Sequence, residues 1–246
     1  MTRAQIHLLL IPGLACDATV WEPQLAHFAK QADVKVQVAN LGVRATTQAM
    51  AQALLEQYPG DLAVAGFSLG GYVVQEMARQ APARMRGVAL LATQAGTDPP
   101  AMADVRAGWI RTAREEGMAA LAPVFLPKLA SAGYLAGRGC SEALRAMIER
   151  HAADAFCAEQ EAIRTRNDCS QAMAGLTCPT LAVIPEQDAL VPPANQHKMA
   201  QAGAIQTVAE IPASGHTVML EAPHAVNAAM QGWIDRVRSA PFTLPD

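Results

Sequence analysis

Short apolar runs alternate with amphipathic segments along most of this chain. The runs have the length of buried strands, and we expect strands at 5–11, 33–38, 61–65, 85–92, 180–184 and 205–211. Elsewhere apolar residues recur every three or four positions, which predicts helices at 21–30, 46–58, 72–79 and 224–237. Such alternation is typical of a parallel sheet that helices cover on both faces. We therefore predict an α/β fold.

The alternation is interrupted between residues 98 and 170, where the sequence predicts no strand. Helical patterns at 105–116, 118–125 and 141–151 are separated there by proline and glycine. We interpret residues 98–170 as a helical insertion over the open edge of the sheet. Residues 1–97 and 171–246 would then form the core that this insertion interrupts.

Length and composition indicate an ordinary globular protein. A chain of 246 residues can bury a full core as one domain, and 51% of its residues are hydrophobic. The net charge is −3 and no run of like charges occurs, so we expect neither nucleic acid nor an anionic membrane as a partner. No apolar run approaches the roughly 18 to 20 residues of a membrane span.

The cysteines argue against a disulfide framework or a zinc site. There are five, an odd number, and they are scattered without a Cys-x-x-Cys pair. This usage favours a reducing compartment, and we expect a cytoplasmic protein. Arg3 followed by the apolar residues 6–14 could be mistaken for a signal peptide, but Pro12-Gly13 interrupts that run, and a buried first strand explains it better.

The segment Gly66-Phe67-Ser68-Leu69-Gly70 fits the Gly-x-Ser-x-Gly pattern of a nucleophile elbow. A predicted strand precedes it and a predicted helix follows it, as that turn requires. The turn raises the serine hydroxyl above the sheet, and the helix N-terminus brings backbone N–H groups beside it. Ser68 is therefore the candidate nucleophile.

A serine hydroxyl needs a base, and His216 is the best candidate. It follows the last predicted strand, and Ser214-Gly215 before it permits a tight loop that can place the imidazole ring over the end of the sheet. The other histidines lie inside predicted elements, at the start of the last helix or in the insertion, namely His7, His27, His151, His197 and His224.

The base in turn needs an acid that orients it, and Asp188 is the favoured candidate. It follows the strand at 180–184, and the apolar, proline-rich residues after it would hold the turn rigid. Open α/β sheets place their sites at such carboxyl ends of strands. Glu186 on the same loop and Asp98 after an earlier strand remain alternatives.

Two backbone N–H groups are needed to hold an oxyanion. One is expected from Leu69, directly after the nucleophile, and the other from Leu14 in the loop after the first strand. One such donor is worth roughly 3 to 4 kcal/mol in serine hydrolases. The neighbouring Cys16 has no base assigned to it, and we interpret it as a small buried residue.

Together these residues resemble the α/β-hydrolase superfamily, in particular its single-domain esterases and lactonases with a helical cap. The resemblance covers essentially the whole chain and rests on Pro12-Gly13-Leu14, residues 66–71, Asp188 within 187–193, and Gly215-His216. Because the chain starts almost at its first core strand, the resemblance suggests a minimal sheet of about six strands. Pro12 stands where many members carry a histidine, a change that the backbone donor at Leu14 would survive.

The resemblance implies cofactor-free acyl transfer without a metal. The expected activity is hydrolysis of a carboxylic ester or lactone through an acyl-enzyme on Ser68, with His216 as base and Asp188 as orienting acid. The partner would be a small-molecule acyl substrate, and the protein would be a monomer or homodimer. In the insertion, the candidate pocket residues are Trp109, Leu121, Phe125 and Leu126.

The same triad also serves other reactions, since fold and triad do not decide the substrate. Enol-lactone hydrolysis, carbon–carbon bond hydrolysis and cofactor-free perhydrolysis are alternatives, and a ligand receptor with little turnover is a remote one. An arginine facing the pocket would favour a substrate that carries a carboxylate. The insertion offers Arg106, Arg111, Arg114, Arg138 and Arg145.

Overall fold

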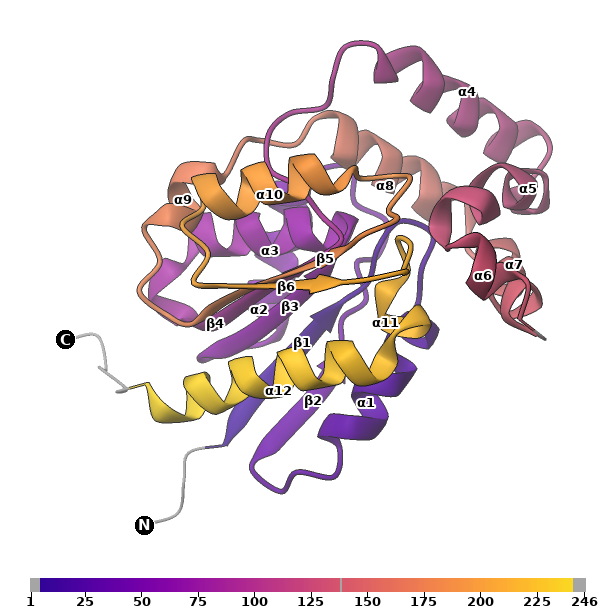
Figure 1. Ribbon diagram of the computed structural model, residues 1–246. Coiled ribbons are helices and arrows are strands. Elements are labelled where there is room, and N and C mark those ends of the chain that lie inside the picture. The colour runs from indigo at the N-terminus through magenta and orange to yellow at the C-terminus, as the bar shows by residue number, and fades with distance from the viewer. Residues whose placement is uncertain (1–4, 138, 241–246) are drawn as a thin grey trace.

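A sheet of six parallel strands runs through the centre of the computed structural model, which describes residues 5–137 and 139–240 (Figure 1). The strand order is β2-β1-β3-β4-β5-β6, and each neighbouring pair is parallel. The bounds are β1 (Ile6–Ile11), β2 (Val34–Val38), β3 (Leu62–Phe67), β4 (Met85–Leu91), β5 (Thr180–Pro185) and β6 (Thr207–Ile211). The expected parallel sheet of about six strands is confirmed.

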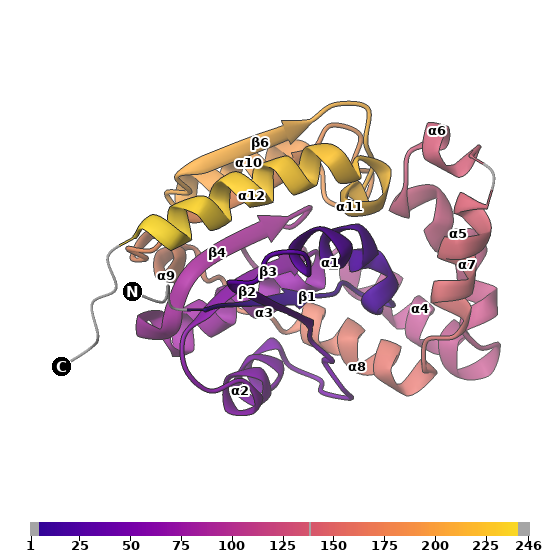
Figure 2. The same cartoon turned by 90° about the horizontal axis from the view of Figure 1, so that it is seen from below.

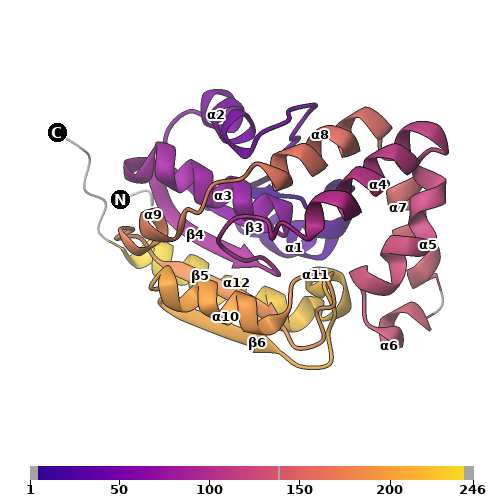
Figure 3. The ribbon, with the colours of Figure 1, turned by 90° about the horizontal axis from the view of Figure 1, so that it is seen from above.

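Helices cover both faces of this sheet, as the alternating pattern predicted. On one side lie α1 (Glu22–Phe28) and α12 (Pro223–Ser239), which contact each other and are seen together in Figure 2. The other side carries α2 (Thr47–Gln57), α3 (Leu69–Gln80) and α10 (Pro193–Ala202), which face the viewer in Figure 3. Short turns η1 (Ala18–Trp21), η2 (Pro82–Arg84) and α11 (Val218–Glu221) complete the connections.

The two hydrophobic cores follow from the alternation of side chains along each strand. In β1, Leu8 and Leu10 point into the cluster that also holds Trp233 of α12. Leu9 and Ile11 point into the opposite cluster, with the buried side chains of α2 and α3. Because both faces are covered, β3 is apolar and buried throughout, and the alternation of polar and apolar residues seen in half-exposed strands is missing there.

The remaining helices connect β4 to β5 and contain no strand among the described residues. They are α4 (Met102–Glu115), α5 (Met118–Leu129), α6 (Ala132–Leu135), α7 (Cys140–Glu149), α8 (Ala153–Arg164) and α9 (Ser170–Ala174). Helices α4 to α7 lie beyond the carboxyl ends of the strands (Figures 1 and 3). Our placement of this segment over an open edge was wrong, because the edges of the sheet are β2 and β6 and the helices instead cover its carboxyl end. The domain boundaries at 98 and 170 stay a prediction.

Helix α8 has no counterpart among the expected helices. Its buried face includes Glu159 and Gln160 beside Phe156 and Ile163, so polar residues interrupt its apolar stripe. The apolar residues Phe156, Cys157, Ala162 and Ile163 still share its buried face, so hydrophobic spacing leaves a signal for this helix that our prediction did not use.

Glycine at position 66 is predicted to be indispensable, because a Cβ there would overlap the carbonyl group of Gly70 in the backbone of α3. Gly66→Ala should lower the free energy of unfolding by more than about 3 kcal/mol, since backbone cannot move aside as a side chain can. Gly232 in α12 has no heavy atom within 4 Å of its virtual Cβ, so Gly232→Ala should instead stabilise the protein by about 0.5 to 1 kcal/mol. Urea unfolding of both variants checks this, and equal midpoints for the two would contradict it.

Candidate active site

Ser68 occupies the sharp turn between β3 and α3. Its backbone has φ +52° and ψ −114°, in a region that residues other than glycine rarely adopt. Three hydrogen bonds hold this conformation: Ser68 N–H donates to Leu91 O at 3.0 Å, and Ser68 O accepts from Gly71 N–H at 2.9 Å and from Thr93 Oγ1 at 2.8 Å. The strained conformation is thus maintained by the backbone of Leu91 and Gly71 and by the side chain of Thr93.

His216 lies on the loop that follows β6, with 2% of its surface exposed. Its Nδ1 atom is 2.8 Å from Oδ2 of Asp188, and its ring packs on Phe67 with 4.9 Å between the ring centroids. The loop is held against α5, since Thr217 N–H donates to Leu129 O at 2.7 Å. A Cβ on Gly215 would overlap the backbone at Ala130, so glycine is needed for this close approach.

Asp188 is buried on the loop after β5, and hydrogen-bond donors surround its carboxylate. Oδ1 accepts from the N–H groups of Leu190 and Val191 at 2.9 and 2.8 Å. Oδ2 accepts from Gln196 Nε2 at 2.9 Å in addition to its contact with His216. These hydrogen bonds hold the carboxylate in one position, where it can orient the imidazole ring.

The two alternative acids lie elsewhere. Glu186 is exposed, and its carboxylate accepts a hydrogen bond from Ala213 N–H at 2.8 Å. Asp98 is bound by two arginines. Of these three acids, Asp188 is therefore the one that contacts His216.

Ser68 and His216 line the same cavity, which has a volume of about 100 Å³. Leu14 also lines it, whereas Leu69 is buried at the start of α3. The other described residues along its wall are Phe67, Tyr72, Gln94, Met102, Arg106, Trp109, Phe125, Leu129, Ile163, Leu190 and Val191. Trp109 and Phe125 were expected there.

Leu121 and Leu126, the other two pocket candidates, are buried in the hydrophobic core and are absent from the described lining of this cavity. Several lining residues were missed, although their positions give a signal. Tyr72 follows the elbow by one turn of α3, and Leu190 and Val191 follow Asp188 directly. Residues just beyond the carboxyl ends of parallel strands surround the site of an open α/β sheet, so these neighbours could have been proposed.

The loop after β1 lies directly against the elbow. A Cβ on Gly13 would press against the Phe67 ring and Ser68 Cβ, so the loop backbone approaches the serine closely. Cys16, at the end of this loop, is buried and is one of the five free cysteines. Burial, together with the charges of Glu159 and Asp17, raises the pKa of its thiol far above the usual range. The thiol therefore stays protonated and is a poor nucleophile.

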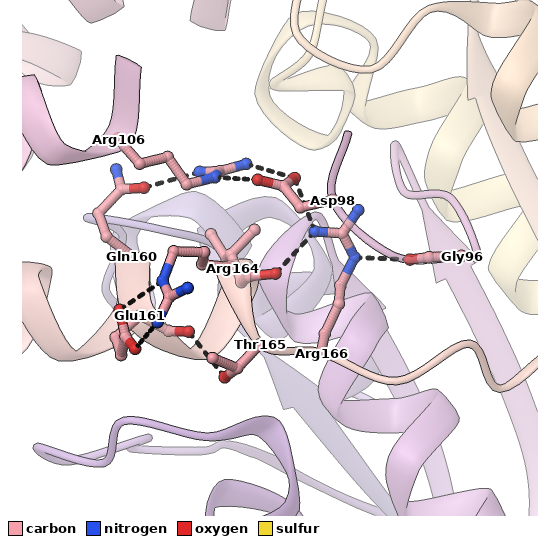
Figure 4. A network of polar contacts seen from close by, with 9 residues as sticks. Gly96, Asp98, Arg106, Gln160, Glu161, Arg164, Thr165 and Arg166 are labelled. Atoms are coloured by element: carbon pink, nitrogen blue, oxygen red, sulfur yellow. Dashed lines mark hydrogen bonds and ion pairs between the residues drawn. The ribbon is translucent and has the colours of Figure 1, made fainter. Parts of the chain in front are cut away.

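Arg106 belongs to a buried ionic network beside the cavity (Figure 4). Its guanidinium donates to both oxygens of Asp98 at 2.6 and 3.0 Å and to Gln160 Oε1 at 2.7 Å. Arg166 donates to the same Asp98 carboxylate at 2.9 Å and lies over the ring of Tyr72, 4.3 Å from its centroid. Two cations share one anion, so this group carries a net charge of +1.

The other arginines proposed for the pocket lie apart from it. Arg111 and Arg114 are exposed on α4, and Arg145 is 3.6 Å from Glu149 on α7. Arg138 lies outside the described residues.

The described part of the chain shows no group of three or more His, Cys, Asp and Glu side chains placed to hold a metal ion. Nor does any helix within residues 5–137 and 139–240 combine the length and apolar character that crossing a membrane requires.

The sequence profile of the alpha/beta hydrolase family matches residues 8–229 of the chain. The chain belongs to this family. It is also 32% identical, over 200 residues, to a pimeloyl-[acyl-carrier protein] methyl ester esterase of Klebsiella pneumoniae, with 76% of this chain and 77% of the relative covered. The resemblance recognised in the sequence is thereby confirmed.

Other similar proteins support the assignment to this family. The chain is 28% identical to the biotin biosynthesis bifunctional protein BioHC of Cellvibrio japonicus, but spans only 48% of that protein's length while 95% of the chain is matched. A thermophilic esterase of Thermogutta terrifontis has the same fold with a TM-score of 0.85 and 28% identity, covering 96% of this chain and 92% of the esterase. An enol-lactonase of Burkholderia xenovorans shares the fold with a TM-score of 0.82 at 22% identity, covering 94% and 92% of the two chains.

Asp98 is predicted to stabilise the protein through its two arginines. Burial disfavours its charge, but hydrogen bonds from Arg106 and Arg166 hold its pKa below the usual value. Asp98→Asn should lower the free energy of unfolding by about 3 kcal/mol at neutral pH, because it leaves two buried guanidinium groups without their anion. Asp104→Asn, on the exposed side of α4, is the matched control and should change it by less than about 0.5 kcal/mol.

The same contribution should depend on pH. Because the folded pKa of Asp98 lies below the unfolded value of about 3.9, its stabilisation is complete above about pH 5 and is lost as the pH falls through the folded pKa. The difference in unfolding free energy between wild type and Asp98→Asn should therefore shrink below about pH 4. Urea titrations at several pH values measure it, and a difference that grows on acidification would contradict the assignment.

Proposed function

We propose that this protein hydrolyses a carboxylic ester or lactone, with Ser68 as nucleophile, His216 as base and Asp188 as orienting acid. The observation that carries the proposal is that Ser68, in a strained elbow, lines one cavity together with His216, whose Nδ1 contacts the buried Asp188. The named relatives that act on esters support this reaction class.

In this mechanism the Ser68 hydroxyl attacks the carbonyl carbon while Nε2 of His216 takes its proton. Asp188 engages Nδ1, which leaves Nε2 as the proton acceptor. The N–H groups of Leu14 and Leu69 stabilise the negative oxygen of the tetrahedral intermediate. His216 then gives its proton to the leaving alcohol, and a water molecule deprotonated by His216 releases the acid and restores Ser68.

The cavity favours a short acyl group. A volume of about 100 Å³ lies below the roughly 300 to 1,000 Å³ of cavities that bind drug-sized ligands. The wall combines the apolar side chains of Trp109, Phe125 and Leu129 with Arg106. We infer a preference for a short acyl group.

The triad is tested with p-nitrophenyl esters from acetate to octanoate. Ser68→Ala should abolish measurable turnover, and Asp188→Asn should lower kcat by about three to four orders of magnitude, because the imidazole loses its oriented tautomer. Glu186→Gln is the matched control: the amide can still accept from Ala213 N–H, and kcat should stay within about twofold of wild type. Turnover by Ser68→Ala at the wild-type rate would refute the mechanism, and a preference for octanoate would refute the short acyl group.

Arg106 favours, as a second candidate, an acyl substrate that carries its own carboxylate, as an acidic lactone does. The network of Arg106, Arg166 and Asp98 gives this part of the cavity wall a net positive charge. A guanidinium group that is largely removed from water attracts a substrate carboxylate more strongly than an exposed one does.

This specificity is tested by comparing p-nitrophenyl hemisuccinate with p-nitrophenyl butyrate, which have similar lengths and differ in charge. Wild type should prefer the hemisuccinate. Arg106→Gln should lower the ratio of kcat/KM for the hemisuccinate to kcat/KM for the butyrate by about 10- to 100-fold, which corresponds to the loss of one charged hydrogen bond. Arg111→Gln, on the exposed side of the same helix, should leave the ratio unchanged. An unchanged ratio in Arg106→Gln would leave the neutral ester as the substrate.

A further inference from the structure

A buried carboxylate outside the triad is bonded to the loop that carries Leu14. Oε2 of Glu159, a residue of α8, accepts a hydrogen bond from Ala15 N–H at 3.0 Å, across 144 residues of sequence. Glu159 is 3% exposed, although carboxylates are rarely buried without a partner that requires them. The mechanism above does not use this group.

The bonded peptide is the one that follows Leu14. Its N–H, on Ala15, donates to Glu159, and its C=O, on Leu14, accepts from Cys16 Sγ at 3.3 Å. Ala15 itself has φ +54°, a left-handed conformation that costs a non-glycine residue free energy unless its surroundings maintain it. Both polar atoms of this peptide plane are therefore held, directly beside the proposed oxyanion donor.

Glu159 is in turn fixed by its neighbours. His151 Nε2 lies 3.2 Å from the same Oε2 atom. Beside it, the guanidinium group of Arg150 donates to the carboxylate of Asp17, the residue directly after the loop, at 2.6 and 3.0 Å. Burial opposes a charge on His151, but the hydrogen bond and the charge of Glu159 raise its pKa. These contacts join the helices between β4 and β5 to the loop after β1.

A separate cavity of about 580 Å³ borders this arrangement. Pro12, Cys16, His151 and Glu159 line it, and the described residues of its wall include none that lines the Ser68 cavity. Glu159 thus contacts the loop from outside the substrate site and does not face the substrate.

We propose that Glu159 is a positioning residue for the hydrolytic reaction, holding the 12–16 loop so that Leu14 N–H points at the developing oxyanion. This inference rests on the proposed function of Ser68. Because Ala15 N–H is already engaged, it also assigns the loop's oxyanion donor to Leu14. A displaced donor weakens binding of the transition state more than binding of the substrate, whose carbonyl oxygen carries less charge.

The experiment measures kcat and KM on p-nitrophenyl acetate for the wild type, Glu159→Ala and Glu159→Gln. Glu159→Ala removes the acceptor and should lower kcat about 10- to 100-fold, somewhat less than loss of a whole oxyanion donor, with KM changed less than about threefold. Glu159→Gln keeps an oxygen that can accept from Ala15 N–H and should restore kcat to within about threefold of wild type. Glu161→Ala, on the same helix with its carboxylate paired to Arg164, is the matched control and should behave as wild type.

A merely structural role predicts another pattern. Glu159→Ala would then lower the melting temperature and leave kcat of the folded enzyme within twofold of wild type, which would overturn the proposal. Equal losses of kcat in Glu159→Gln and Glu159→Ala would overturn it as well. Should Glu159→Ala not fold, Glu159→Asp, one methylene shorter with the same charge, should still lower kcat, and a wild-type kcat there would also refute the role.

The failure of the proposed function has a different signature. If wild type and Ser68→Ala hydrolyse the ester equally, the serine mechanism is wrong, whatever the Glu159 variants do. If Ser68→Ala is inactive and Glu159→Ala retains wild-type kcat, only the role of Glu159 is wrong.

Discussion

The close approach of backbone to backbone around Ser68 is the constraint on which the rest of the site depends. A Cβ on Gly70 would overlap the carbonyl groups of Ile11 and Pro12, and one on Gly66 would overlap Gly70. Helix α3 can therefore begin against the ends of β1 and β3, which forces the sharp turn at Ser68 and its positive φ. The same packing brings the loop after β1 beside the serine, so the close approaches at Gly66 and Gly70 arrange the proposed nucleophile and the proposed oxyanion donor together.

Three buried carboxylates near this turn have different partners and hence different consequences. Asp188 is surrounded by N–H donors and His216, which hold its carboxylate in one position, as the proposed orienting role requires. Asp98 is shared by two arginines and leaves a net positive charge at the cavity wall. Glu159 binds a backbone amide. Helix α8 connects two of these arrangements, because its adjacent residues Glu159 and Gln160 reach the loop after β1 and Arg106 respectively.

Much of the fold could be predicted, because strands and glycine-rich turns leave local patterns in the sequence. The parallel sheet of six strands agrees with the expected alternation, and most boundaries differ by only one or two residues. Helix α3 begins at Leu69 rather than 72, since the elbow itself starts the helix. The helices between β4 and β5 were harder to predict from the sequence. Helix α8 was not predicted, although Phe156 and Ile163 lie on its buried face. Leu121 and Leu126 pack into the core because helix rotation, which spacing alone does not specify, turns them away from the cavity.

The sequence by itself determined the class of fold, the elbow at Ser68 and the loops on which His216 and Asp188 stand, because these depend on residues that are neighbours in the chain. Only the tertiary structure decided which acid contacts His216, which arginine faces the cavity and that Glu159 reaches Ala15. Those contacts join residues 28 to 144 positions apart. They depend on how whole helices are placed and rotated over the end of the sheet, and no local pattern encodes that placement.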